Sequence, residues 1–533
     1  MKLFKILFLL LLLLNTSIFY AQIQTPNSIS NPDIKWDLTQ KKFPEGFISS
    51  VKILKSDNDY IYYYLKSFKV LIMGFNYNHF LVKYDRKTCD YAFLDITPSK
   101  KNKKLEILTA DTLDNKFHVY SYFHNKKLKK LFVFDESFDY QTLKPYNDIN
   151  KFCEIDLTEK GSLLENMFLV SDNNKLLFRY SCEDVKGKYY GLEVFNKKLE
   201  REWGSFNMAK TENGYNYESD YKIDNNGNVY AIQRNYERKS DIYKHYDRSR
   251  VWVVCYLKDA SEPVSTALIL KNDLFITAER LAINTKNQVV IAGLYAQPGT
   301  ESAVGGFSFV LEPNLTKISS VQTNEFTKQL LAKGLDSKKM NEDTKKIVEK
   351  KDFEKNFGYR FNDIYFRKDG CFDLVAEKYY SVTVTYKNSS TTYYYFDDLL
   401  VLNFNADGSF KWIQKIPKYE YVIDMYSDIG GYYLYHDKND GMNFIFNIAN
   451  YVPQFIGYKH KSSTVKLRLD KEGNESFNEM ISDSEISCTI VPDYIYLENN
   501  DNLIITRANT VKTIMPFMDK YNNIMFGLLK QRN

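Results

Sequence analysis

Histidine offers proton-transfer and metal-binding chemistry near neutral pH, and this sequence contains six widely scattered histidines. His118 lies in an alternating, strand-like run, where we expect a structural histidine with a hydrogen-bond partner. His245 and His436 fall in or beside variable segments and are the better functional candidates. His436 and Asp437 together offer groups that bind a proton or a metal, but neighbouring side chains on an extended chain point apart. The histidines therefore predict no metal site.

The adjacent carboxylates Asp397 and Asp398 are candidates for acid–base catalysis. The separation of two carboxyl groups decides such chemistry, and the sequence does not determine that separation. We therefore expect solvated charges at the edge of a strand. The sequence also contains no Gly-rich phosphate loop, no paired-histidine zinc motif and no nucleophile elbow. It predicts no catalytic residue, no bound metal and no cofactor.

Many short turns rich in Asp, Asn and Gly suggest calcium at first sight. Ca²⁺ takes about six to eight oxygen ligands, whereas each of these turns offers one or two carboxylates without the twelve-residue loop pattern. Asp and Asn also favour turns because their side chains bond to the local backbone and tolerate left-handed conformations. We therefore predict turn-forming residues and no calcium sites.

The composition indicates a folded chain rich in strands. Of the 533 residues, 44% are hydrophobic and 26% are charged, which excludes intrinsic disorder. The 43 Tyr and 37 Phe favour pleated, half-buried strands over helices. A net charge of +5 is too small to indicate nucleic acid binding.

The N-terminus resembles a secretory signal peptide. Lys2 and Lys5 precede an apolar run over residues 6–14, and Ala21 offers a small residue at the cleavage point. The apolar run is too short to span a bilayer, and no later segment is apolar enough. We predict a signal peptide over residues 1–21 and an exported, soluble chain in the periplasm, on the cell surface or in the medium.

The six cysteines stand too far apart in sequence for a zinc knuckle or a redox pair. Several lie in apolar runs, and we expect small core side chains there. An oxidising compartment could still join one pair, of which Cys153 and Cys182 are nearest in sequence.

A repeated pattern organises the rest of the chain. A polar turn followed by an apolar run recurs at about 60-residue spacing, and a second turn follows each first one. Two hairpins in each unit mean four antiparallel strands. The first turns are at Asp57, Asp114, Asp172, Asp224, Asn284, Lys368, Asp428 and Asn499, and the second turns are at Asp85, Asp135, Asn196, Lys258, Glu312, Asp407, Asp470 and Asp519.

The repeats resemble those of exported bacterial β-propeller proteins. The resemblance implies an all-β ring of four-stranded antiparallel blades. Eight units are counted, and seven blades are the alternative because the seventh unit is irregular. We predict an N-terminal segment over residues 22–48 that joins the ring, a β-propeller over residues 49–533, and a helical insertion over residues 323–356 between units five and six. In that insertion Phe326, Leu330 and Leu331 share one face, which we expect to pack on the ring.

The longest variable segments belong to units four, six and seven and should share one face of the ring, which makes that face the candidate binding face. In unit six, two Tyr-rich runs flank residues 387–390 and predict a projecting hairpin. The candidate binding residues are Tyr236, Tyr243, His245, Arg248, Tyr379, Tyr380, Tyr386, Tyr393, Tyr394, Tyr395 and His436.

A fold of this class assigns no activity. The favoured hypothesis is an exported, non-catalytic binding or scaffolding protein of the cell envelope, with a protein partner on the Tyr-rich face. The alternative is a propeller that binds or cleaves a polysaccharide, with aromatic rings stacked on sugar rings. A third hypothesis is an enzyme with its site in the central channel.

Overall fold

The computed structural model describes residues 34–36, 47–71, 74–96, 99–100, 103–146, 148–158, 162–172, 174–184, 187–208, 215–236, 249–258, 260–298, 303–333, 353–386, 389–423, 430–454, 457–483, 488–499, 502–510 and 521–530. The predicted signal peptide lies outside these residues. No helix among the described residues is both long enough and apolar enough to cross a membrane.

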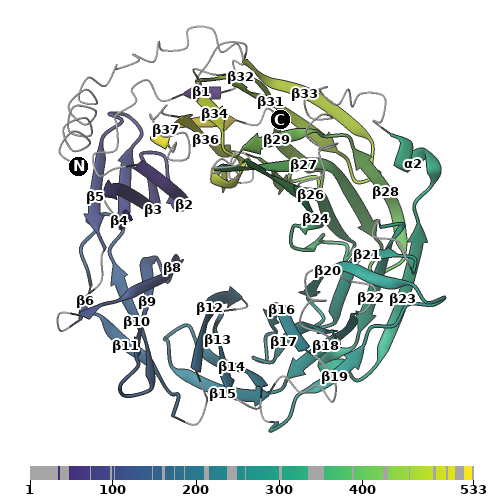
Figure 1. Ribbon diagram of the computed structural model, residues 1–533, viewed down its shortest axis with the longest axis horizontal. Coiled ribbons are helices and arrows are strands. Elements are labelled where there is room, and N and C mark those ends of the chain that lie inside the picture. Colours follow the sequence, from purple (N-terminus) through teal and green to yellow (C-terminus); the bar gives the residue numbers. More distant parts are fainter. Residues whose placement is uncertain are drawn as a thin grey trace.

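Antiparallel strands follow one another around a ring (Figure 1). The first sheet contains β2 (Phe47–Ser56), β3 (Tyr60–Leu71), β4 (Gly74–Asp85) and β5 (Tyr91–Asp95). The second contains β8 (Glu106–Leu113), β9 (Lys116–Asn125), β10 (Lys130–Phe138) and β11 (Asn150–Asp156). The third contains β12 (Ser162–Asp172), β13 (Lys175–Asp184), β14 (Gly187–Asn196) and β15 (Arg201–Met208). A two-stranded ribbon of β6 (Ser99–Lys100) and β7 (Lys103–Lys104) lies between the first two sheets in sequence.

The ring continues with two further four-stranded sheets. One contains β16 (Tyr215–Ile223), β17 (Val229–Tyr236), β18 (Arg250–Tyr256) and β19 (Val264–Ala267). The other contains β20 (Phe275–Ile283), β21 (Val289–Ala296), β22 (Gly305–Leu311) and β23 (Ile318–Glu325). The short helix α2 (Lys328–Ala332) follows β23.

A ten-stranded sheet comes next. Its strands are β24 (Phe353–Phe361), β25 (Tyr365–Phe366), β26 (Phe372–Tyr386), β27 (Ser389–Phe404), β28 (Phe410–Ile416), β29 (Glu420–Ile423), β30 (Tyr432–His436), β31 (Met442–Gln454), β32 (Gly457–Leu469) and β33 (Glu475–Asp483). The long hairpins β26–β27 and β31–β32 form its two centres, and β29 pairs with both β27 and β31.

The two ends of the chain meet in the last part of the ring. There β36 (Asn502–Thr510) pairs with β34 (Cys488–Ile490), β35 (Tyr496–Asn499) and β37 (Tyr521–Lys530). The N-terminal strand β1 (Ile34–Trp36) pairs with the other edge of β37. A bridge between Ile48 and Tyr521 connects this sheet to β2. The ring is thus closed with strands from both ends of the chain.

Apolar clusters between successive sheets hold the ring together. The middle strands β21 and β22 are buried along their whole length because both of their faces are covered. One cluster packs Ile232 and Val253 against Ile291 and Phe309 of the next sheet. The edge strand β23 is mostly exposed and polar, as expected for the outer edge of a blade. An all-β ring of stacked antiparallel sheets is therefore confirmed, and it has the architecture of a β-propeller.

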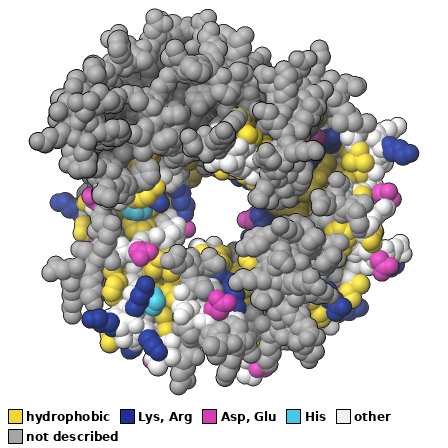
Figure 2. All heavy atoms as spheres, viewed as in Figure 1, with side chains coloured by type: hydrophobic (Ala, Val, Ile, Leu, Met, Phe, Trp, Pro, Cys, Tyr) yellow, Lys and Arg dark blue, Asp and Glu magenta, His cyan; other side chains and the backbone are white. Residues whose placement is uncertain are grey.

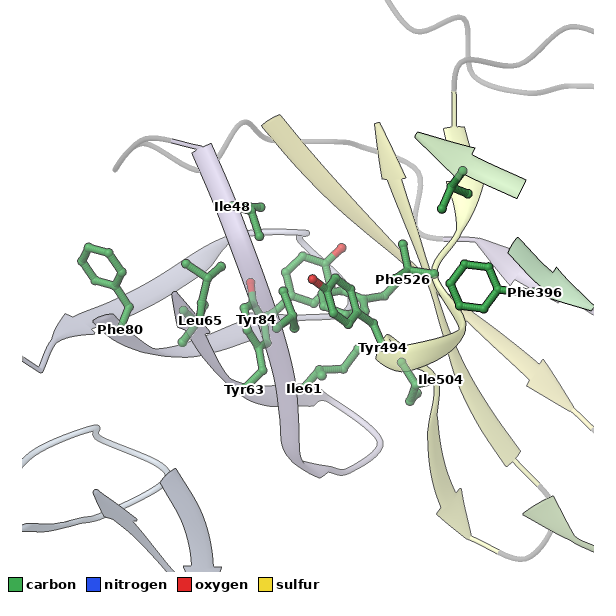
Figure 3. Close-up of a cluster of buried hydrophobic side chains, with 14 of the residues drawn as sticks. Ile48, Ile61, Tyr63, Leu65, Phe80, Tyr84, Phe396, Tyr494, Ile504 and Phe526 are labelled. Atoms are coloured by element: carbon green, nitrogen blue, oxygen red, sulfur yellow. The ribbon is translucent and has the colours of Figure 1, made fainter. Parts of the chain in front are cut away.

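The first and last sheets share another cluster (Figure 3). The ring of Phe526 lies 5.5 Å from that of Tyr63 and 5.0 Å from that of Tyr84, measured between centroids. Phe396 of β27 lies at one end of the same cluster. This cluster therefore joins the junction of the ring to the hairpin β26–β27.

Two predicted turns are wrong. Asp135 lies inside β10, where its Oδ1 is 2.8 Å from His118 Nδ1, and the turn itself begins at Asp139. This contact confirms His118 as a structural histidine. In unit seven the first turn is at Asp437, between β30 and β31, whereas Asp428 lies outside the described residues. Asp519 also lies outside them.

Both bounds predicted for the helical insertion are wrong. Residues 323–325 belong to β23 and residues 353–356 to β24, because strand pairing continues up to these positions. Between them α2 is helical, and residues 334–352 lie outside the described residues. Phe326 is buried and Leu330 packs beside it, as predicted, but Leu331 is 45% exposed and does not share their packing.

Four cysteines have the expected core role, since Cys89, Cys153, Cys182 and Cys255 are buried. Cys153 and Cys182 lie in the same apolar cluster and are not joined in this structure.

Candidate functional site

The hairpin β26–β27 contains most of the predicted binding residues, and it has two different faces. Tyr380 pairs with Tyr395, and Val382 pairs with Tyr393, so these four side chains share one face. Tyr393 and Tyr395 are 9% and 1% exposed and belong to the cluster at the ring junction. The rings of Tyr380 and Tyr395 stack with 4.6 Å between centroids. This face is part of the core.

The opposite face of the hairpin carries hydroxyl groups. Cross-strand pairing places Thr383 opposite Thr392, with 3.1 Å between their hydroxyl oxygens. The other members of this hydroxyl face are Ser381, Thr385, Ser390 and Tyr394. Thr385 and Ser390 are exposed, and the remaining four side chains are half-buried. Toward the base of the hairpin this face is also covered, because Phe396 and Val422 on it are buried and Tyr394 packs against the cluster at the ring junction.

The structure separates the predicted binding residues into groups. Tyr379 and Tyr394 are half-buried and stack with 6.4 Å between ring centroids, so both remain candidates. Tyr236 is buried, which is incompatible with its predicted role as a contact residue. Tyr386 lies at the end of β26, and nothing further is described of its side chain. Tyr243, His245 and Arg248 lie outside the described residues.

At the base of this hairpin, Lys418 lies between two carboxylates. Its Nζ is 2.8 Å from Glu377 Oε1 and 3.0 Å from Glu420 Oε2. The exposed fraction of each of the three side chains is 1% or less. The backbone N–H of Gly431 also donates to Glu420 Oε2. We call Glu377, Lys418 and Glu420 the buried triad.

Burial and charge act in opposite directions within the buried triad. Desolvation raises the pKa of Glu420 to about 7, although Lys418 lowers it in part. Desolvation alone would lower the pKa of Lys418, but Glu377 and Glu420 raise it above its ordinary value. The ammonium group of Lys418 is therefore the stable charge of this site.

The predicted solvated pair, Asp397 and Asp398, is not solvated. Asp397 is 5% exposed and lies at an irregular step in the β26–β27 pairing, directly after Phe396, the last residue of β27 that pairs with β29. The carboxylate of Asp398 lies 3.2 Å from Lys415 Nζ and accepts a bond from the N–H of Lys418. These carboxylates are thus held in the sheet by nearby cations, and the expectation of edge charges was wrong.

His436 also lies in a different place from the one predicted. It ends the inner strand β30, immediately before the tight turn at Asp437, and so it lies on the short-turn side of the ring. Its ring stacks on that of Tyr365 with 3.4 Å between centroids, and its Nε2 is 3.5 Å from Asp373 Oδ2. Arg367 donates two hydrogen bonds of 2.9 Å to Asp373.

The turn carboxylates accept hydrogen bonds from the backbone. Asp437 Oδ1 accepts from the N–H groups of Asn439 and Gly441, and Oδ2 accepts from Arg468. These hydrogen bonds lower the pKa of Asp437 to about 2, although its burial acts in the opposite direction. Asp470 accepts from two backbone N–H groups in the same way. Turn formation is therefore confirmed as a role of these residues, and the described part of the chain contains no cluster of three metal-ligating side chains.

The middle of the ring is open in the space-filling view (Figure 2). Polar contacts connect the inner strands that surround it. Asp220 accepts from the backbone N–H of Leu281, Lys222 lies 3.2 Å from Asp363, and Arg280 donates to the carbonyl of Phe361. These contacts join β16, β20 and β24 across sheet boundaries.

Sequence reasoning missed the buried triad and the Arg367–Asp373 pair. The run around Lys418 and Glu420 reads as an exposed charged turn, since lysine and glutamate are rarely fully buried. One signal was available for the seventh unit, because Asp437 and Gly441 reproduce the spacing of the regular turns.

No family model and no curated protein matches this sequence. Among solved structures, the WD40 domain of SCAP from fission yeast is 9% identical over 93% of this chain and 97% of that chain, with a TM-score of 0.33. Polysaccharide lyase Uly1 is 9% identical over 92% and 91%, with a TM-score of 0.31. The β-propeller domain of the Trilobed protease from Pyrococcus furiosus is 9% identical over 83% and 97%, with a TM-score of 0.32. Likenesses of this strength assign neither a family nor an activity.

Proposed function

We propose that this chain is an exported, non-catalytic binding protein of the cell envelope that holds a protein partner on the hydroxyl face of β26–β27. One observation carries this proposal: toward the tip of the hairpin, one face packs in the core through Val382, Val384 and Tyr393, and the other carries the hydroxyl groups of Thr383, Thr385, Ser390 and Thr392. Tyr and Ser side chains supply adaptable contacts in recognition surfaces. A hairpin anchored in this way presents its contact groups without a large ordering cost.

The ring in this proposal has eight blades. The ten-stranded sheet divides at β29 into one set around β26–β27 and another around β31–β32. The last sheet takes its outer strand from β1, and the remaining five sets have four strands each. Export rests on the basic start, the apolar run and Ala21 at the N-terminus.

Differential capture tests the partner. The full chain and a variant with Thr385→Lys and Ser390→Lys are purified from the cell envelope and used as baits on an envelope extract. We expect a protein captured by the parent to be lost from the variant, because two bulky charges would occupy the exposed end of the hydroxyl face. The mass of the parent bait reports whether residues 1–21 are removed in the cell.

The control variant carries Thr323→Lys and Asn324→Lys, which add the same charge at exposed positions on β23. It should capture the same protein as the parent. Equal capture by all three baits, or no capture by any, contradicts the proposed site. Trimming the hairpin is not a suitable test, because it would remove Tyr393 and Tyr395 from the core.

A saccharide is the second candidate ligand, and Tyr365 is the observation that favours it. The side chain is 38% exposed, and its ring rests against His436 with 7° between the ring planes. An aromatic ring held from behind offers its free face to the apolar face of a sugar.

Retention on a column of the envelope polysaccharide tests this candidate. We expect the parent to be retained and eluted by soluble sugar, and Tyr365→Ala to pass through. Tyr146→Ala, at another tyrosine with 46% exposure, should behave as the parent does. Soluble sugar released by the retained parent would extend the candidate to cleavage. Retention of Tyr365→Ala would remove this site from consideration.

A further inference from the structure

The buried triad joins three parts of the ten-stranded sheet. Glu377 comes from β26, Glu420 begins β29, and Gly431 immediately precedes β30. The strand β29 pairs with β27 from Glu420 to Ile423, and at Tyr421 it also pairs with Asn450 of β31. The two long hairpins are therefore connected through the strand that Glu420 begins.

The two carboxylates of the triad have different surroundings. Glu420 Oε2 accepts from Lys418 and from the Gly431 N–H, whereas Glu420 Oε1 is buried and has no hydrogen-bond partner among the described residues. Glu377 Oε2 and Arg360 Nη1 both lie close to Gly431. They are 3.7 Å and 3.8 Å from the position that a Cβ on this glycine would occupy. Arg360 is exposed, so water screens its charge. Glu420 is thus the carboxylate that is least able to remain ionised.

The remaining groups near the triad do not compensate the charge of Glu420. Asp398 lies beside the backbone of Lys418 and pairs with Lys415. The hydroxyl of Tyr432 donates to Asn362. The other titratable and charged groups on the surrounding elements are Arg360 of β24, Asp397 and Asp398 of β27, Lys415 of β28, Tyr419 before β29, and Tyr432 of β30.

Charge balance then decides the protonation state. The sealed triad has no net charge when one carboxyl is neutral and a net negative charge when both are ionised. An uncompensated buried charge costs several kcal/mol, so a buried carboxylate binds a proton and becomes neutral instead. We propose that the buried triad is a proton-binding lock, which holds β29 against β26–β27 while Glu420 is protonated and loosens that joint when Glu420 ionises.

The direction of the pH effect follows from linkage. The pKa of Glu420 is raised from 4.5 to about 7 in the folded chain, mainly by desolvation. A carboxyl with a raised pKa stabilises the fold fully below its unfolded pKa and loses that contribution as the pH rises to the folded pKa. The lock is therefore closed in mild acid and open above neutral pH.

Urea unfolding of the full chain at pH 5.5 and pH 8.5 tests the lock, with Glu420→Gln as the variant that cannot ionise. From pH 5.5 to pH 8.5, the ratio of folded to unfolded chain should fall about 30-fold more in the parent than in Glu420→Gln. Burial also raises the pKa of Glu218 and of Asp220, so only the difference between parent and variant isolates Glu420. Glu472→Gln, at an exposed glutamate, should reproduce the pH dependence of the parent.

Infrared spectroscopy of the folded chain gives a second readout that does not depend on reversible unfolding. In the difference between the spectra of the parent and Glu420→Gln, a protonated carboxyl band should be present at pH 6 and should disappear near pH 7 to 8, because Glu218 and Asp220 contribute to both spectra. The proposal is overturned if the parent and Glu420→Gln share one pH dependence of unfolding. It is equally overturned if their infrared bands titrate identically.

Discussion

Replacing Lys418 with methionine should lower the free energy of unfolding by about 3–5 kcal/mol at pH 7, the cost of removing one partner from a buried ion pair. Methionine fills a similar volume, so little of this loss would come from a cavity. The loss arises because Glu377 and Glu420 are left in the core without their ammonium partner. Urea unfolding of the parent and the variant measures the difference.

Two further measurements separate lost charge from lost packing. At pH 5 Glu420 should be protonated, so less uncompensated charge is left in the core of the variant and its deficit relative to the parent should shrink. Adding Glu420→Gln to Lys418→Met should recover part of the stability at pH 7 for the same reason. Lys471→Met, at a lysine with 63% side-chain exposure, should change stability by less than about 0.5 kcal/mol. A deficit of Lys418→Met that is equal at pH 5 and pH 7 would contradict the electrostatic explanation.

The sequence was sufficient to predict the ring of strands, because turn residues alternate regularly with apolar runs. The hairpin around residues 387–390 was also predicted correctly, and β26 and β27 pair up to Tyr386 and Ser389. Local turn chemistry carries this information: Asp224, for example, accepts a bond from the N–H of Asn228. Such features depend on residues a few positions apart, and the sequence displays them directly.

The errors have a different origin, since they depend on which strands meet in three dimensions. Asp397 reads as an edge charge, but it is 5% exposed and directly follows the part of β27 that pairs with β29, a strand further along the chain. Asp135 reads as a turn residue because its partner His118 lies on the neighbouring strand. In each case a distant residue stabilises a polar side chain that the local sequence would assign to solvent.

The Tyr-rich run from Tyr393 to Tyr395 shows the same distinction within three residues. Composition alone suggests a uniform contact surface, whereas strand alternation places Tyr394 on the opposite face from its two neighbours. The face with Tyr393 and Tyr395 is therefore a structural anchor. The proposed recognition therefore depends on Tyr379, Tyr394 and the hydroxyl groups.

Tyr395→Ala and Tyr394→Ala should consequently differ strongly in stability. Tyr395 is 1% exposed and stacks on Tyr380, and removing a buried aromatic ring costs about 3–5 kcal/mol. Tyr394 is half-buried on the hydroxyl face, so its replacement should cost about 1 kcal/mol. Unfolding in urea, with both variants measured beside the parent, gives the comparison. Similar losses for the two variants would mean that the hairpin does not bury one face, and the proposed binding surface would lose its basis.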